Sequence, residues 1–198
     1  MKDIKQAMAD RRSVYAISGE SVISDERIKE TLAHAVKHVP SPYNSQSQRL
    51  VLLQGENHLR LWDIVRAELK KIVPAKSFAK TEEKLSAFES GYATVLFFND
   101  DAVTDSLIEQ FPSYADNFIK WADQANGMIQ YAVWTLLSAE GLGASLQHYN
   151  PLIDDEVKRA FNLPAKWKLY AQMPFGKPVQ HPGDKDFQAV SDRFIVLD

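Results

Sequence analysis

Arginine and serine stand together near the N-terminus, as Arg11, Arg12 and Ser13. A guanidinium group donates paired hydrogen bonds to a phosphate, and a serine hydroxyl supplies a further donor. These residues directly follow a predicted helix over residues 3–10, and basic residues also complement the dipole at the end of a helix. The motif therefore indicates either a phosphate-binding site or a solvated helix end.

A polar segment, SPYNSQSQ at residues 41–48, comes just before the apolar run at residues 50–53. Amide side chains such as that of Asn44 carry both donors and an acceptor, so they can recognise the edge of a heterocycle. The same kinds of side chain also hold the backbone of an ordinary polar loop. Taken by itself, the segment fits both interpretations.

Two further motifs favour structural interpretations. The segment GLGASLQHYNP, residues 141–151, contains Gly-x-Gly without a third glycine and follows a predicted helix, so it is not a dinucleotide-binding fingerprint. His34 and His38 have the helical spacing of metal ligands, but the sequence shows no third ligand, and we expect no metal. The chain has neither a cysteine nor a G-x-S-x-G motif, which argues against nucleophilic catalysis by thiolate or serine.

A mixture of helices and strands must position these motifs. Apolar residues at helical spacing, for example Ile28, Leu32 and Ala35, predict amphipathic helices, and β-branched and aromatic runs predict buried strands. The predicted helices span residues 3–10, 24–40, 59–72, 81–90, 121–140 and 151–161. The predicted strands span residues 50–53, 92–98, 144–147, 168–173 and 193–197, and a loop is predicted over 177–183.

Length and composition are those of one globular domain, residues 1–198. Hydrophobic residues make up 45% of the chain, enough to build a core, and the net charge of -3 gives no basic footprint for nucleic acid. The sequence shows no secretory signal and no apolar run long enough to span a bilayer. With no cysteine in the chain, we expect a cytoplasmic protein without nucleic-acid or membrane partners.

The order of the motifs is more specific than any one of them. RRSVYA, SPYNSQS, YADNF, WADQANGM and EGLGASLQHYNP follow one another along the chain. In this order they resemble the nitroreductase family of FMN-dependent oxidoreductases, in particular its short bacterial and fungal branch, over nearly the whole chain. The resemblance implies an α+β fold with a central, mainly antiparallel sheet flanked by helices. It also implies an intertwined homodimer that holds FMN at the interface.

A function follows from the same resemblance. Family members use NADH or NADPH as electron donor and reduce a small-molecule acceptor, such as a nitroaromatic, a quinone or a similar electrophile, in two successive (ping-pong) hydride transfers. The alternative is a flavin-binding regulatory or stress-response protein with little turnover, connected with lipid signalling or oxidative stress. In either case the flavin carries the chemistry, so no catalytic side chain is expected.

The family pattern assigns the phosphate and ribityl end of FMN to one subunit. Arg11 and Ser13 would hold this end, with Arg12 beside them. Lys185 is the expected further cation at the phosphate, and Arg193 is a possible substitute for it. The segment Gln147, His148 and Tyr149 would pass beside the reactive edge of the ring.

The remaining flavin contacts are expected at the isoalloxazine ring. Ser41, Pro42 and Asn44 would line the ring from the other subunit. Lys84 is the nearest candidate for a basic group at the N1/O2 edge. The chain also departs from the family pattern at Tyr15, where many members have a lysine or arginine.

Overall fold

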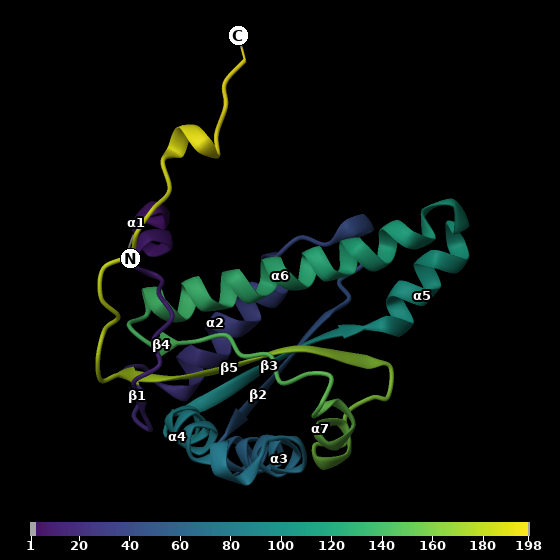
Figure 1. Cartoon of the computed structure of the whole chain (residues 1–198). Coiled ribbons are helices and arrows are strands. Elements are labelled where there is room, and N and C mark those ends of the chain that lie inside the picture. Colours follow the sequence, from purple (N-terminus) through teal and green to yellow (C-terminus); the bar gives the residue numbers. More distant parts are fainter. Residues whose placement is uncertain (1–2, 198) are drawn as a thin grey trace.

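An antiparallel sheet runs through the middle of the molecule, with helices on both faces (Figure 1). The computed structural model describes residues 3–197. The strand order is β1-β5-β3-β2, and β4 also pairs with β5. The expected α+β class with an antiparallel sheet is confirmed. The strands are β1 (Ile17–Ser18), β2 (Gln48–Gln54), β3 (Ala93–Asp100), β4 (Gly143–Ala144) and β5 (Trp167–Pro178).

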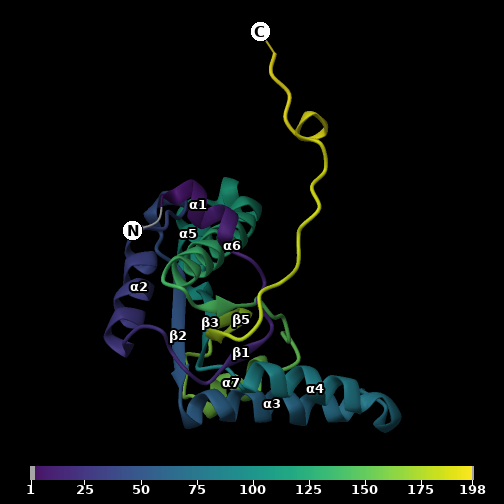
Figure 2. The ribbon, with the colours of Figure 1, turned by 90° about the vertical axis from the view of Figure 1, so that its left-hand side faces the viewer.

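The helices form two layers. α1, α2 and α6 cover one face of the sheet, and α3, α4 and α7 cover the other, while α5 lies at the far end of α6 (Figures 1 and 2). The α-helices are α1 (Ile4–Asp10), α2 (Asp25–His38), α3 (Glu56–Ile72), α4 (Phe78–Glu89), α5 (Asp101–Gln110), α6 (Ala115–Ala139) and α7 (Asp154–Ala160). The short 3-10 helices are η1 (Pro42–Asn44), η2 (Ala75–Ser77), η3 (Pro112–Tyr114) and η4 (Val190–Asp192).

Strand β3 separates two hydrophobic cores. Val95 and Phe97 belong to the core under α2 and α6, whereas Leu96 and Phe98 belong to the core under α3, α4 and α7. Successive side chains of a strand point to opposite faces, and here both faces are covered by helices. For this reason the strand is a continuous apolar run instead of an alternating one.

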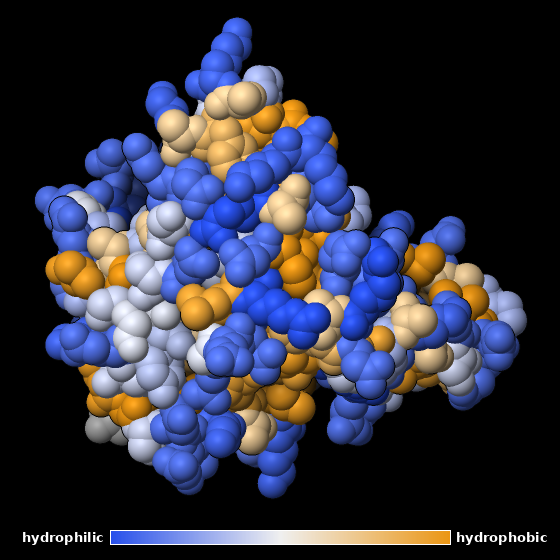
Figure 3. Space-filling model, turned by 90° about the horizontal axis from the view of Figure 1, so that it is seen from below, coloured by the Kyte–Doolittle hydropathy of each residue, from blue (hydrophilic) through white to orange (hydrophobic). Residues whose placement is uncertain are grey.

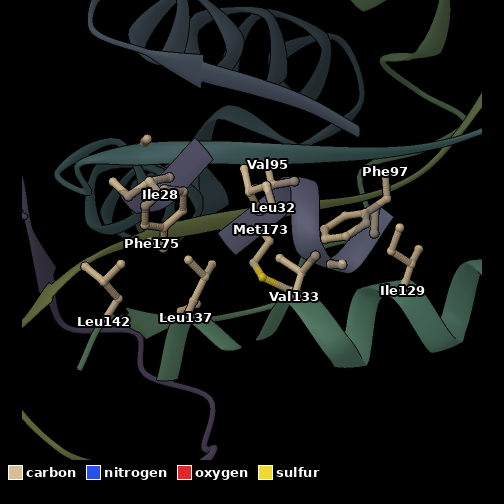
Figure 4. Packing of buried hydrophobic residues seen from close by; sticks show 14 residues of the cluster. Ile28, Leu32, Val95, Phe97, Ile129, Val133, Leu137, Leu142, Met173 and Phe175 are labelled. Carbon is tan, nitrogen blue, oxygen red and sulfur yellow. The ribbon is translucent and has the colours of Figure 1, made fainter. Parts of the chain in front are cut away.

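Helix α6 supplies most of one wall of the first core. Ile129, Val133 and Leu137 recur at helical spacing and point toward Val95 and Met173 of the sheet (Figure 4). Burying each such side chain contributes about 1.5–3 kcal/mol to folding. In contrast, the outer surface seen from below, over α3, α4 and α7, is mostly hydrophilic with smaller apolar areas (Figure 3).

Several helices differ from the sequence prediction. α6 begins at Ala115, earlier than the predicted residue 121, and α5 was not predicted at all. The start of α5 is marked by Asp100, whose carboxylate accepts a hydrogen bond from the Ala102 backbone N–H at 3.2 Å. The last helix begins at Asp154 instead of residue 151, because residues 150–153 form a turn before it.

The predicted strand at residues 193–197 is wrong. These residues form no strand, and Phe194 and Leu197 are 67% and 91% exposed. A strand needs a hydrogen-bonded neighbour. The segment after Pro178, here called the tail, leaves the sheet and extends away from the body of the molecule (Figures 1 and 2). Among residues 3–197, no helix is long and apolar enough to cross a membrane.

Candidate functional site

The N-terminal segment that follows α1 lies against β4. Ser13 forms a parallel bridge with Ala144, and the Val14 backbone N–H donates to the Ala144 carbonyl at 2.9 Å. The close approach depends on Gly143, because a Cβ at that position would lie 2.8 Å from Cγ1 of Val14. The two motifs predicted from sequence, RRS and GLGAS, are therefore neighbours in space.

The Arg11 guanidinium packs on the ring of Trp134. Its guanidinium carbon lies 4.3 Å from the centroid of the Trp134 ring, and Trp134 is itself fixed by a hydrogen bond from its Nε1 to the Ala144 carbonyl. The Arg11 Nε is buried and has no hydrogen-bond partner among residues 3–197. A buried, unpaired donor on a cation is costly unless an acceptor satisfies it. A phosphate oxygen is a suitable acceptor, so this residue fits the expected cofactor.

Arg12 points toward the tail. Its Nη2 donates to the Gly183 carbonyl at 2.9 Å, and the side chain lines a cavity of about 320 Å³ together with His181 and Pro182. Lys185 follows two residues later on the tail and is exposed, with its Nζ 5.2 Å from the Phe187 ring centroid. In a single chain, Arg12 therefore anchors the tail beside the N-terminal segment.

The segment at residues 147–149 is clamped to strand β5 by Gln172. The backbones of Gln147 and Gln172 exchange hydrogen bonds of 2.7 and 2.9 Å, and the Gln172 Oε1 accepts from the Tyr149 N–H at 2.8 Å. Gln172 is completely buried, and its Nε2 has no hydrogen-bond partner in the part of the chain that the structure describes. The clamp holds the backbone of this strip in a fixed position, while the His148 side chain is exposed.

Three further residues gather around the ring of Phe88. The Lys84 Nζ lies 5.7 Å from the Phe88 ring centroid, and the Tyr15 ring lies 6.2 Å from it. Trp62 contacts the same ring at 5.1 Å and also meets Tyr149 edge-on at 6.1 Å. Lys84 on α4 and Tyr15, two residues beyond Ser13, therefore both contact the Phe88 ring.

The loop with Ser41, Pro42 and Asn44 lies elsewhere in the chain. Tyr43, between them, packs on Trp121 in the first half of α6, whereas Arg11 packs on Trp134 in the second half. These tryptophans are 13 residues apart in α6, which corresponds to about 20 Å along the axis. In one chain, Arg11 lies on the α6 side of the sheet and Lys84 on the α4 side, and the 41–44 loop lies at the other end of α6 from Arg11.

Within that loop, Ser41 forms hydrogen bonds with the loop backbone. Its Oγ accepts a hydrogen bond from the Gln46 N–H at 2.8 Å, and its carbonyl accepts from the Asn44 N–H at 3.0 Å. The Asn44 side chain is exposed. Ser41 therefore shapes the loop, and Asn44 is the amide that the loop presents to solvent.

Trp134 and Gln172 are the residues that sequence analysis missed. Gln172 stands in the otherwise apolar run LYAQMPF of β5, and a buried amide in such a run is a usable signal, since buried polar groups need partners. Trp134 carries no signal of its own, because its role depends on Arg11. The rings of His34 and His38 lie 4.5 Å apart between centroids, tilted by 45°. Among residues 3–197 no group of three or more His, Cys, Asp or Glu could hold a metal ion.

Comparison with known proteins identifies this arrangement as that of an α+β oxidoreductase. The model of the nitroreductase family matches residues 8–177. Nitroreductase CinD from Lactococcus lactis, solved with chloramphenicol, superposes with a TM-score of 0.91 at 43% identity, over 99% of this chain and 100% of that one. The same protein is also solved with 4-nitrophenol.

Two other proteins extend the comparison. The nitroreductase FRM2 of Saccharomyces cerevisiae is 34% identical over 91% of both chains. A nitroreductase with bound FMN from Desulfitobacterium hafniense shares the fold, with a TM-score of 0.74 at 15% identity over the full length of both chains. The chain belongs to the nitroreductase family, and the expected enzyme class, a nitroreductase-type oxidoreductase, is confirmed. The expectation of FMN is confirmed at the level of the family.

Proposed function

We propose that this chain binds FMN and uses NADH or NADPH to reduce nitroaromatics, quinones or similar electrophiles in two successive half-reactions. The main support is Arg11, a cation with an unpaired buried donor, fixed over Trp134 beside Ser13 and β4. Such a group suits a terminal phosphate. The binding of 4-nitrophenol by the Lactococcus lactis relative supports an aromatic nitro compound as acceptor.

The chain's own residues would bind FMN and orient it. When bound, FMN supplies the hydride chemistry that the side chains lack. Arg11 and Ser13 would hold its phosphate end, and the strip clamped by Gln172 would present backbone groups to its ring. Burial raises the pKa of Tyr149 to about 12, so its hydroxyl stays protonated and neutral at physiological pH. Lys84, which packs on the same Phe88 ring as Tyr15, would supply positive charge to the flavin.

We also propose that the functional unit is a homodimer in which Asn44 of the partner subunit completes each site. The separation of the 41–44 loop from Arg11 along α6 supports this, because a single chain holds only part of the expected contacts. An apolar groove of about 450 Å³ between α1, α2 and α6 supports it as well. Ile4 and Met8 at this groove are 72% and 50% exposed, and obligate dimers bury apolar surfaces of this kind.

The tail gives independent support for the dimer. Phe187, Val190, Phe194 and Ile195 are each at least 67% exposed, although they are apolar. A second chain would cover them in a dimer. Lys185 would then approach the flavin phosphate from the tail, which stays a prediction.

Absorption spectra and steady-state kinetics test the proposed function. The purified protein should show bound flavin or take up FMN in preference to FAD, because Arg11 and Ser13 suit one terminal phosphate better than a bridged diphosphate. Added 4-nitrophenol or a quinone should then accelerate the oxidation of NADH or NADPH. A protein that binds no flavin would refute the proposal. Bound flavin without acceptor-dependent turnover would instead indicate the regulatory or stress-response alternative.

A further inference from the structure

The backbone of the 41–46 loop has an uncommon conformation. Tyr43 has φ 54 and ψ 22, and Asn44 and Gln46 have φ 50 and φ 49. The left-handed region is uncommon for residues with a side chain, and asparagine tolerates it better than a bulky aromatic residue does. Tyr43 in this conformation therefore costs free energy that other contacts must offset.

An aromatic cluster provides those contacts. The ring of Tyr43 lies 5.2 Å from Phe111, 5.4 Å from Phe118 and 6.3 Å from Trp121, measured between centroids. These partners come from the end of α5 and from α6, so they lie outside the loop. Tyr43 still has 56% of its surface exposed, which is unusual for a ring that contacts three others.

The other end of the loop is fixed separately. Arg49 on β2 donates to the Gln46 carbonyl, and its other nitrogen, Nη2, contacts the Asp100 carboxylate at 2.9 Å. The loop is thus held at Tyr43 by rings and at Gln46 by an ion-paired arginine. Asn44 stands between the two anchors with its amide exposed.

We propose that Tyr43 is a positioning residue for the cofactor site. Its ring, fixed on Phe111, Phe118 and Trp121, holds the loop in the left-handed conformation that directs Asn44 toward the flavin of the partner subunit. The inference rests on the proposed function. Tyr43 would act on FMN binding through the position of Asn44 and would not itself contact the cofactor. It predicts that FMN binding depends on a ring at position 43, even where glycine relieves the backbone strain.

Three variants at position 43 separate the ring from the backbone. Tyr43→Phe keeps the ring, Tyr43→Ala removes the ring and keeps the strain, and Tyr43→Gly removes both. FMN affinity, measured by quenching of flavin fluorescence, should be near wild type for Tyr43→Phe. It should fall about tenfold or more for both others, the effect expected from losing two or three aromatic contacts. Thermal unfolding of the flavin-free variants should be measured alongside, because Tyr43→Ala loses the ring contacts that offset the strained backbone.

A double-mutant cycle tests whether the aromatic cluster carries the effect. Phe111→Ala removes the nearest partner from outside the loop and should also weaken FMN binding. The double variant Tyr43→Ala/Phe111→Ala should be no weaker than Tyr43→Ala, since contacting residues are not additive. Tyr114→Ala is the matched control, because Tyr114 contacts Trp121 in the same cluster. This control should leave FMN affinity unchanged.

The outcomes distinguish this inference from the proposed function. If wild type binds FMN and Tyr43→Gly binds it equally well, the ring has no positioning role. The inference then fails, while the proposed function still stands. Equal losses in Tyr43→Phe and Tyr43→Gly would assign the effect to the hydroxyl and also overturn it. If Tyr43→Gly does not fold, the cycle with Phe111→Ala decides. Failure of wild type to bind flavin would refute the proposed function itself.

Discussion

Replacing Arg11 tests the proposed contact with the FMN phosphate directly. We expect Arg11→Ala to weaken FMN binding by about 1.5–3 kcal/mol, or roughly ten- to hundredfold, the usual value of a hydrogen bond to a charged group. Isothermal titration of the flavin-free protein measures this. Arg12→Ala is the control, because its Nη2 is engaged by the Gly183 carbonyl, and it should have the smaller effect. Full flavin occupancy of Arg11→Ala in dilute solution would show that Arg11 is an ordinary helix end.

A second residue, His58, links stability to pH. It is 2% exposed and lies between the Thr94 Oγ1, at 2.9 Å, and the Glu89 carbonyl, at 3.0 Å. The carbonyl can only accept, so Nε2 carries the proton and Nδ1 accepts from the threonine hydroxyl. That hydroxyl in turn accepts from Trp62 Nε1 at 3.2 Å. All three groups are satisfied when the histidine is neutral.

Burial accordingly lowers the pKa of His58 below its ordinary value of 6.5. On acidification the unfolded chain takes up this proton before the folded chain does. The free energy of unfolding should therefore fall as pH drops below about 6.5, and His58 should add no further change below its folded pKa. Urea unfolding of wild type and His58→Gln between pH 5 and 8 measures this. Equal slopes for the two proteins would contradict the assignment.

At the scale of elements, the periodic patterns of single helices and strands were predictable from sequence, but the pairing of one strand with another was not. Amphipathic α2, with its cap at Ser24, and the apolar strand β3 follow from local periodicity. The prediction for residues 193–197 failed because strand propensity does not provide a strand neighbour. α5 was missed because the capping signal at Asp100 is weak without a clear apolar period.

The candidate site was likewise predictable from sequence only in part. The RRS and GLGASLQHYNP motifs were found from sequence because their order matches a family pattern. Their contact through Ser13 and Ala144, and the clamp from Gln172 to Tyr149, join residues far apart in the chain. Pairing of this kind depends on the strand register, which a single sequence does not specify.

Gly143 gives a prediction at this scale. A Cβ at position 143 would meet Val14 Cγ1 at 2.8 Å, so Gly143→Ala should push β4 away from the N-terminal segment. We expect a loss of about 1–3 kcal/mol in the free energy of unfolding, as for other overpacked sites, together with weaker FMN binding. Urea unfolding and flavin titration measure the two effects.

Gly127 provides the matched control. It lies inside α6, where an added Cβ meets nothing within 4 Å. Gly127→Ala should therefore stabilise the protein by about 0.5–1 kcal/mol, the usual difference between alanine and glycine within a helix. If Gly143→Ala behaved like Gly127→Ala, the close packing of β4 would not matter.

For the whole molecule, complementation between subunits tests the shared site. Arg11→Ala and Asn44→Ala homodimers should each bind flavin poorly. A mixed dimer would carry one intact site and one site with both defects, so flavin occupancy should return to about half of wild type by two-fold symmetry. Flavin absorbance of isolated heterodimers measures this. Heterodimers that form but regain no flavin would place both residues in one chain's site, or exclude Asn44 from it.

Helix α6 has a consequence for how such a chain can change in length during evolution. Its 25 residues connect the Trp121 end, which holds the 41–44 loop, to the Trp134 end, which holds Arg11. One inserted residue would shift one end by about 1.5 Å and rotate it by about 100°. Insertions and deletions should therefore be excluded between these tryptophans and accumulate in connections such as residues 179–183, where a change of length moves neither end of the helix.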